Sequence, residues 1–215
     1  LIYTSGTTGR PKGAMLTHQY IVSNVKAATK HIYWDDKDRL LSFLPLCHSF
    51  ERTAGYYAII SCGAEIYYAE SVDTVSKNMP EVKPTVMISV PRLFEKIYNL
   101  IVKSVEEGSD TKKKVFNWAV ETGRKYASGK RGLVSVQKKI ADKLVFNKLK
   151  ERTGGQIRLF VSGGAALPPD IDDFFKAAGL TILQGYGLTE TSPVMAANKV
   201  GEEITGVVGA VIPGV

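Results

Sequence analysis

The sequence is poor in cysteine, and its two cysteines form none of the patterns found at metal or disulfide sites. Cys47 and Cys62 lie in apolar surroundings, and no CxxC pair or Cys/His cluster occurs among the 215 residues. This excludes a disulfide framework and a zinc site of ordinary spacing. We expect both cysteines to be reduced thiols in the core, which favours a cytoplasmic protein.

Long hydrophobic runs and several catalytic motifs are also missing. No apolar run approaches the roughly 18 residues that a membrane-spanning helix needs. There is no Gly-x-Ser-x-Gly elbow, no HExxH and no aspartate-rich cluster, which argues against serine hydrolases and metallohydrolases. The net charge of +7 is compatible with nucleic-acid binding. Because no motif that reads DNA or RNA accompanies it, we expect no nucleic-acid partner.

The pattern of apolar residues indicates an α/β fold. Hydrophobic residues make up 44% of the chain, which is enough for the core of a sizeable domain. Short apolar runs alternate with segments of helical period, as is typical of mostly parallel sheets flanked by helices. Strands are predicted at Leu1–Tyr3, Leu40–Leu44, Glu65–Tyr68, Val86–Val90, Ile157–Val161 and Leu180–Gln184.

Residues that favour helix starts precede several helical segments. Thr17 and Ser71 are predicted to cap two helices, and Pro168 with Pro169 opens a third. The apolar faces predicted for the first and third of these helices carry Ile21, Val22, Val25, Ala28, Ile171, Phe174 and Phe175.

One segment, residues 111–152, departs from the rest of the chain in charge. It has thirteen Lys or Arg residues against three acidic ones, a balance of +10. Apolar residues recur within it near helical spacing and predict an amphipathic helix; they are Leu133, Val136, Ile140, Leu144 and Leu149. Two interpretations stay open: a solvated basic face on surface helices, or a docking surface for CoA phosphates or for anionic lipids at the inner face of a membrane.

A glycine- and hydroxyl-rich loop, within Tyr3–Gly13, follows the first predicted strand. Three glycines allow tight turns that aim N–H groups at one point, while four hydroxyl side chains and Lys12 add further donors, a combination that suits polyphosphate. The loop is not a Walker A sequence, because Pro11 stands where that motif needs glycine. A plain linker is the alternative, which the density of hydroxyl groups disfavours.

A second glycine motif occupies residues 184–191. Two glycines flank Tyr186, whose ring is suited to stacking on a base. Thr189 and Glu190 place a hydroxyl and a carboxylate side by side, which suits an α-phosphate and its Mg²⁺. The motif is not a dinucleotide fingerprint, because Glu190 stands where that pattern requires glycine.

Together the two motifs resemble the signatures of the adenylate-forming superfamily, which includes acyl-CoA synthetases, luciferases and peptide-synthetase adenylation domains. They occur in the expected order and at the expected distance, and the resemblance extends along nearly the whole chain. The segment Leu44–Arg52 and the basic segment look like the long-chain fatty acid CoA ligase branch. The resemblance implies that residues 1–215 are a partial AMP-binding domain, the central fragment of the large N-terminal domain of such an enzyme.

Two further segments gain roles from this resemblance. Residues 162–168 follow a predicted strand, and turns after such strands are where open α/β sheets hold ligands. The resemblance implies that this turn lines the adenine and acyl pocket, although small residues are also what a tight turn needs. His48, at the start of a predicted helix, is either structural or, as the resemblance implies, close to the reacting carboxylate.

The implied reaction has two steps: a fatty acid attacks MgATP to give acyl-adenylate and pyrophosphate, and CoA then displaces AMP. Catalytic roles fall on Lys12, His48, Thr189 and Glu190, with Thr4 and Glu190 near Mg²⁺. Nucleotide-binding roles fall on Thr4, Ser5, Gly6, Thr7, Thr8, Gly9, Lys12, Gly163, Gly164, Ala165, Gln184, Gly185, Tyr186, Gly187 and Thr189.

Both ends of the sequence are apolar and look like cuts in a longer protein. The resemblance places ribose-binding residues and a C-terminal lid domain outside this chain, so we expect the chain alone to be inactive. Two other functions stay open. One is adenylation of a different carboxylic acid, and the other is nucleotide or lipid binding without catalysis.

Overall fold

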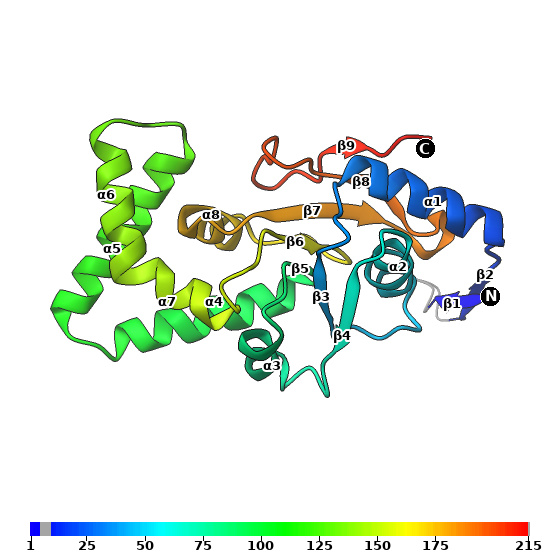
Figure 1. Cartoon of the computed structure of the whole chain (residues 1–215), viewed down its shortest axis with the longest axis horizontal. Helices are drawn as coiled ribbons and strands as arrows, with labels where there is room; N and C mark the ends of the chain where they lie inside the picture. Colours follow the sequence, from blue (N-terminus) through cyan, green and yellow to red (C-terminus); the bar gives the residue numbers. More distant parts are fainter. Residues whose placement is uncertain (5–9, 215) are drawn as a thin grey trace.

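A seven-stranded sheet forms the middle layer of the molecule, with helices on both faces (Figure 1). The computed structural model describes residues 1–4 and 10–214. The strand order is β4-β3-β5-β6-β7-β8-β9, parallel from β4 to β7 and antiparallel from β7 to β9. The strands are β3 (Arg39–Ser42), β4 (Glu65–Tyr68), β5 (Val86–Ser89), β6 (Leu159–Ser162), β7 (Ile182–Gly187), β8 (Val194–Ala197) and β9 (Ala210–Val211). The predicted α/β fold with a mostly parallel sheet is confirmed.

The central strands are buried on both faces, which explains why they read as unbroken apolar runs. Every residue of β5 and β6 is buried. Because side chains alternate along a strand, Val86 and Ile88 pack into the core on one face, while Met87 packs into the core on the other.

The helices divide between these two cores. On one face α1 (His18–His31), the π-helix η1 (Glu51–Tyr57) and α2 (Ala58–Ser61) cover the sheet around Ile32 and Trp34. On the other face the Phe94 ring meets Phe160 and Phe175 edge-on, with ring centroids 5.3 and 5.4 Å apart. The helices of that face are α3 (Val75–Val82), α4 (Pro91–Glu106), α5 (Asp110–Ala127), α6 (Leu133–Ala141), the π-helix η2 (Asp142–Phe146), α7 (Asn147–Arg152) and α8 (Pro169–Ala178).

Two of the three predicted helix starts are confirmed. The Thr17 side chain accepts a hydrogen bond from the Tyr20 amide at 3.2 Å and caps α1, and α8 begins at Pro169. Ser71 does not cap a helix. It closes a turn in which its Oγ accepts from the Thr74 amide at 3.3 Å, and α3 starts only at Val75.

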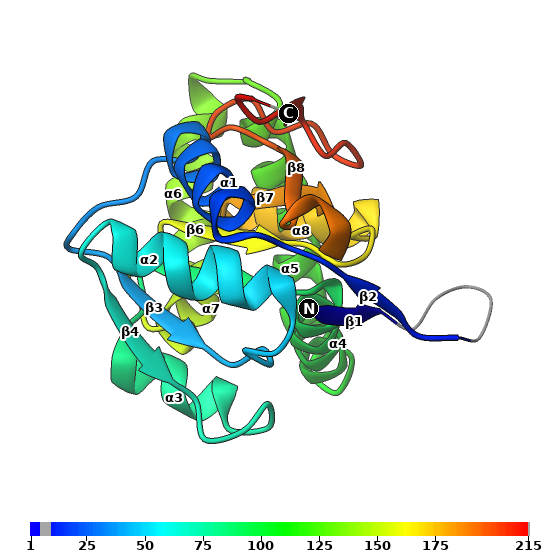
Figure 2. The same cartoon turned by 90° about the vertical axis from the view of Figure 1, so that its right-hand side faces the viewer.

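The first predicted strand pairs outside the main sheet. β1 (Ile2–Thr4) and β2 (Lys12–Ala14) form an antiparallel two-stranded sheet of their own. Figure 1 shows this hairpin at one end of the molecule and the α5–α6 pair at the other, and Figure 2 views the molecule from the hairpin end.

The basic segment is helical as predicted, but of the five residues in its predicted apolar stripe only Leu149 is buried. Leu133, Val136, Ile140 and Leu144 are 73, 56, 47 and 52% exposed. The inward side of α6 carries Lys138 instead, which is buried and reaches Asp142 Oδ1 at 2.6 Å. The ion pair allows a lysine to lie inside, because its charge is matched there.

The two cysteines differ in burial. Cys47 is exposed in the turn after β3, so the prediction of a core thiol is wrong for it, whereas Cys62 is partly buried and packs against the core that contains Trp34. In the described part of the chain no helix combines the length and the apolar character that crossing a bilayer would need.

Candidate active site

A narrow pocket opens at the edge of the sheet where the parallel strands end. Three loops that are far apart in the sequence meet there: the loop after β3, the turn after β6 and the end of β7. The pocket has a volume of about 70 Å³, room for a few water molecules. Its mouth is formed by His48, Ser49, Gly163, Gly164, Gly185, Tyr186, Gly187, Leu188 and Thr189, all within or beside the predicted motifs.

The interior of the pocket is apolar and runs under α1 and η1. Ala28, Trp34, Ala54 and Ala58 line it, and the small alanine side chains leave a slot between the helices and the sheet. Trp34 is 8% exposed, and its indole Nε1 has no hydrogen-bond partner among the described residues. A single polar donor in an otherwise apolar slot suits an aliphatic ligand better than a polar one.

Gly163 is where two of the motifs touch. A methyl group at this position would lie 2.8 to 3.2 Å from the Phe50 ring, closer than real contacts allow. Phe50 directly follows Ser49 and is itself part of the pocket wall. Glycine is therefore required for the turn after β6 to approach the loop after β3, and the two loops form one wall.

The end of β7 is held by an equally close approach. A methyl group on Gly187 would lie 1.9 Å from the Pro193 carbonyl oxygen, so only glycine fits beside the return strand β8. Next to it, the Ser49 hydroxyl donates to Thr189 Oγ1 at 3.4 Å, which links the His48 loop to the second motif. Tyr186 between these contacts is 50% exposed, so one side of its ring is open to a ligand.

Gln184, a predicted nucleotide-binding residue, has its side chain turned away from the pocket. Its Nε2 donates to Asp172 Oδ2 on α8 at 3.0 Å, and its backbone amide donates to Asn198 Oδ1 at 2.7 Å. Burial raises the pKa of Asp172, although nearby Lys176 and the Gln184 amide act against it. These contacts fix the strand that carries Tyr186.

His48 lies at the mouth of the pocket and is exposed. Its Nδ1 accepts a hydrogen bond from the Phe50 amide at 3.2 Å. This contact directs Nε2 away from the helix, leaving it as the nitrogen available to a ligand.

The remaining predicted residues lie around this mouth or beyond it. Gly164 lines the pocket, while Ala165 next to it is exposed outside. Glu190, in the short 3₁₀ turn η3 (Thr189–Thr191), is exposed and borders a separate depression beside Tyr20 and Ser23 of α1. Among the described residues no three His, Cys, Asp or Glu side chains gather at a common point.

The phosphate-loop predictions are only partly within the described residues. Thr4 and Lys12 are paired across the β1–β2 hairpin, and the Thr4 hydroxyl donates to the Lys12 carbonyl oxygen at 3.4 Å. The Lys12 side chain is exposed. Ser5, Gly6, Thr7, Thr8 and Gly9 lie outside the described residues.

Two buried polar residues near the pocket were not predicted. Glu51, 1% exposed at the start of η1, accepts from the Ser42 hydroxyl at 2.5 Å through Oε1. Burial raises its pKa to about 7, and the hydrogen bond from Ser42 limits the rise. Asn24 on α1 donates to the Val194 carbonyl at 2.7 Å and accepts from its amide at 3.2 Å, which fastens α1 to β8 over the pocket. A polar residue inside an apolar helical stripe was the signal for Asn24.

Comparison with known proteins agrees with this geometry. The model of one family, described as AMP-binding enzyme, matches residues 1–215. The chain belongs to this family. It is 37% identical over 219 residues to long chain acyl-CoA synthetase 7, peroxisomal, of Arabidopsis thaliana, covering 99% of this chain and 30% of that protein. It is also 37% identical over 224 residues to the long-chain-fatty-acid–CoA ligase FadD15 of Mycobacterium bovis, covering all of this chain and 36% of that protein.

Solved structures share the fold. ATP-bound MatB from Rhodopseudomonas palustris superposes with a TM-score of 0.68 at 24% identity, over 99% of this chain and 33% of that one. The N-terminal domain of FACL13 from Mycobacterium tuberculosis gives a TM-score of 0.67 at 20% identity, over 99% of this chain and 42% of that one. The chain thus spans about a third of the length of the curated relatives it matches.

Proposed function

We propose that the protein containing this chain is an AMP-forming acid–thiol ligase. It activates a long-chain fatty acid with ATP to an acyl-adenylate and pyrophosphate, and then transfers the acyl group to CoA. The observation that carries the proposal is the pocket that joins the His48 loop, the Gly163 turn and the Tyr186 strand end above an apolar slot. The similarity to long-chain acyl-CoA synthetases supports the choice of acid.

Each part of the pocket has a role in this reaction. The half-exposed ring of Tyr186 stacks on adenine. Gly163 and Gly164 let the backbone approach the nucleotide, and the Thr189 hydroxyl donates to the α-phosphate. Thr4 and Lys12 on the hairpin bind the β- and γ-phosphates. Charge stabilisation by such fixed donors is the main demand of phosphoryl and adenylyl transfer.

The fatty acid enters with its chain in the alanine-lined slot and its carboxylate at His48. The slot of about 70 Å³ is too small for a long chain, so binding requires α1 and η1 to move away from the sheet. The carboxylate carries the same sign of charge as ATP, and His48 Nε2 offsets the repulsion by donating a hydrogen bond.

Mg²⁺ is implied by the resemblance, and the donor set is compatible with it. Mg²⁺ prefers one or two carboxylates completed by phosphate oxygens and water. Glu190 supplies an exposed carboxylate next to Thr189, and Thr4 supplies a hydroxyl. When bound, the ion would neutralise phosphate charge. These residues would hold the ion together with ATP, whose phosphate oxygens would complete its ligands.

A substrate screen tests the proposal. ATP–pyrophosphate exchange by the full-length protein is expected with palmitate and related fatty acids. Exchange only with an aromatic or amino acid would assign the protein to the alternative of a different carboxylic acid. Saturable ATP binding without exchange on any acid would identify a non-catalytic nucleotide-binding module.

The role of His48 is tested by separating the half-reactions. His48→Ala is expected to slow palmitoyl-adenylate formation by roughly 100-fold, the effect of a positioned proton or hydrogen-bond donor, while ATP binding and thioester formation from supplied palmitoyl-adenylate change little. A structural histidine would instead lower the melting temperature and slow both half-reactions together.

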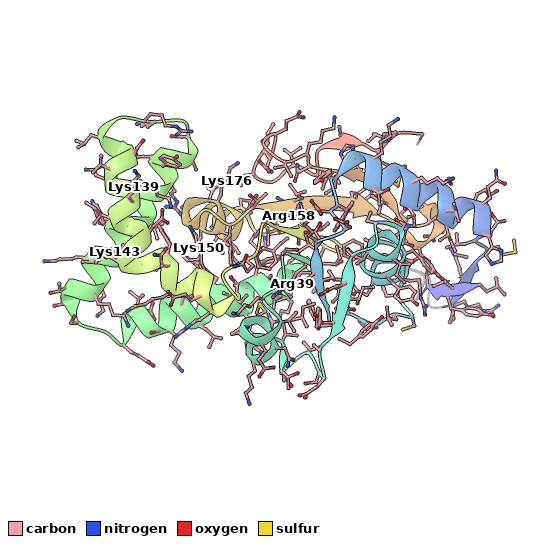
Figure 3. The ribbon with its side chains drawn as sticks, viewed as in Figure 1. Arg39, Lys139, Lys143, Lys150, Arg158 and Lys176 are labelled. Atoms are coloured by element: carbon pink, nitrogen blue, oxygen red, sulfur yellow. The ribbon has the colours of Figure 1, made fainter. Side chains whose placement is uncertain are left out.

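We also infer that α6 and η2 dock on an anionic membrane. Four aliphatic side chains, Leu133, Val136, Ile140 and Leu144, form an exposed stripe along these helices. Lys139 and Lys143 extend beside it (Figure 3). An exposed apolar stripe flanked by lysines is the pattern of helices that lie in the membrane interface.

A further inference from the structure

A second, larger cavity lies among the helices on the face of the sheet opposite the active-site pocket. It is a groove between the α4–α5 corner and the η2–α7 segment, with a volume of about 610 Å³. Its floor is formed by Phe146, Leu149 and Phe174, which are 0, 6 and 2% exposed. The groove therefore reaches into the core of this helical layer and is not a surface dimple.

The walls of the groove are apolar and its rim is basic. Ile101, Val105, Val115 and Phe116 form walls that are partly buried. Three exposed cations lie at the rim: Lys112, Lys148 and Arg152. No carboxylate is among the described residues that line the cavity.

One of the rim cations is held in place by the fold. Lys112 Nζ donates to the Ser104 carbonyl at 2.5 Å and to Ser104 Oγ at 3.2 Å, which joins the end of α4 to the first turn of α5. Lys148 and Arg152 stand one turn apart on α7. Within the described residues neither forms an ion pair.

We propose that this groove binds a long-chain free fatty acid, with the alkyl chain on the aromatic and aliphatic floor and the carboxylate at Lys148 and Arg152. The positive charge of the rim favours an anionic head group, and arginine can bind a carboxylate through two parallel hydrogen bonds. The cavity falls within the roughly 300–1,000 Å³ typical of small-ligand sites, which suits one acyl chain rather than the two chains of a phospholipid.

This site is distinct from the one assigned to catalysis. The two cavities share no lining residue. The groove is lined by side chains of the Phe94 core, whereas the active-site pocket is lined by side chains of the Trp34 core on the other face of the sheet. The groove proposal therefore does not depend on the proposed ligase activity.

Photoaffinity labelling of the full-length protein tests the proposal. The probe is a palmitate analogue with a diazirine near the end of its chain, applied after the catalytic site has been filled with a non-hydrolysable palmitoyl-adenylate analogue. Adducts are expected in peptides from residues 101–116 and 144–152, and excess palmitate should abolish them. Adducts confined to residues 28–58, or absent once the catalytic site is filled, would overturn the proposal.

Palmitate binding by variants that lack the rim cations gives the second test. With the catalytic site filled, the double variant Lys148→Ala and Arg152→Ala is expected to weaken palmitate binding by roughly tenfold or more, as loss of hydrogen bonds to a charged group does. The matched control Lys114→Ala removes an exposed lysine of α5 that does not line the groove, and should change binding less than twofold. Equal losses in both variants, or tighter binding of palmitoyl-CoA than of palmitate, would contradict the assignment.

Discussion

Replacing Glu51 by glutamine should make the protein more stable at neutral and alkaline pH. The carboxyl is buried beneath η1, where Ser42 donates to Oε1 and Oε2 has no partner among the described residues. Burial raises its pKa from 4.5 to about 7, because the charged form loses its hydration. Glutamine keeps the shape and one acceptor but never ionises.

The size and sign of the effect follow from these two pKa values. Each pH unit between them corresponds to about 1.4 kcal/mol, so complete ionisation costs about 3 kcal/mol. The folded protein keeps a proton that the unfolded chain releases above pH 4.5. The contribution of Glu51 to the free energy of unfolding is therefore fully present below pH 4.5, falls as the pH rises, and is lost once the pH passes about 7.

Urea unfolding of the wild type and of Glu51→Gln at several pH values measures this. Between pH 5 and pH 8 the free energy of unfolding of the wild type should fall by about 2 to 3 kcal/mol relative to the variant. Glu70→Gln, at an exposed position, controls for the loss of one acidic side chain. If the curves of wild type and Glu51→Gln run parallel, Glu51 is not buried in the form described.

Three further outcomes are expected. Gly163→Ala should lower the free energy of unfolding by about 1–3 kcal/mol through overpacking against Phe50. The control Gly185→Ala should be nearly neutral, because the nearest atom to a methyl group there is 3.6 Å away. Equal effects of the two variants in chemical denaturation would contradict the close approach at Gly163. Glu190→Gln should slow adenylation by roughly 100-fold, about 3 kcal/mol, and a loss below threefold in a folded protein would remove the metal role. For the basic segment, sedimentation of the protein with vesicles should show binding to anionic but not to neutral lipid. Salt should reverse the binding, because exposed charges act over about 8 Å at physiological ionic strength. Equal binding to both lipids would favour a solvated basic face.

Strand positions could be predicted because both faces of the central strands are covered. Val86–Ser89 and Leu159–Ser162 have only apolar or small side chains, as strands buried on both faces do. The short β8 and β9 were not among the predicted strands; β8 pairs with β7, and β9 pairs only with β8, at the edge of the sheet.

Periodicity predicted the helices of the basic segment but not which side faces inward. The apolar stripe that includes Leu133 and Ile140 is exposed, while Lys138 is buried by its ion pair with Asp142. From hydropathy alone, the leucine and the isoleucine would be expected inside and the lysine outside. The partner Asp142 lies one turn away on the same segment, but the spacing of the two residues does not tell whether their ion pair faces the core or the solvent.

The candidate site could be predicted as motifs but not as a pocket. The rule that ligands lie at the carboxyl ends of parallel strands brought the Gly163 turn and the Tyr186 motif to one edge, and the structure adds the contact of Ser49 with Thr189. Nothing in the sequence distinguishes Gln184, which points into the helical layer, from its neighbours that face the mouth. The direction of a single side chain depends on the strand pleat, which motif matching does not report.

The most direct test of the proposed adenylation is a single-turnover experiment without CoA. The full-length protein is mixed with MgATP labelled at the α- and γ-phosphates and with palmitate, and the products are separated. The proposed function predicts pyrophosphate and protein-bound palmitoyl-adenylate in equal amounts, and AMP only after CoA is added. Release of inorganic phosphate and ADP, or no reaction until CoA is present, would contradict it.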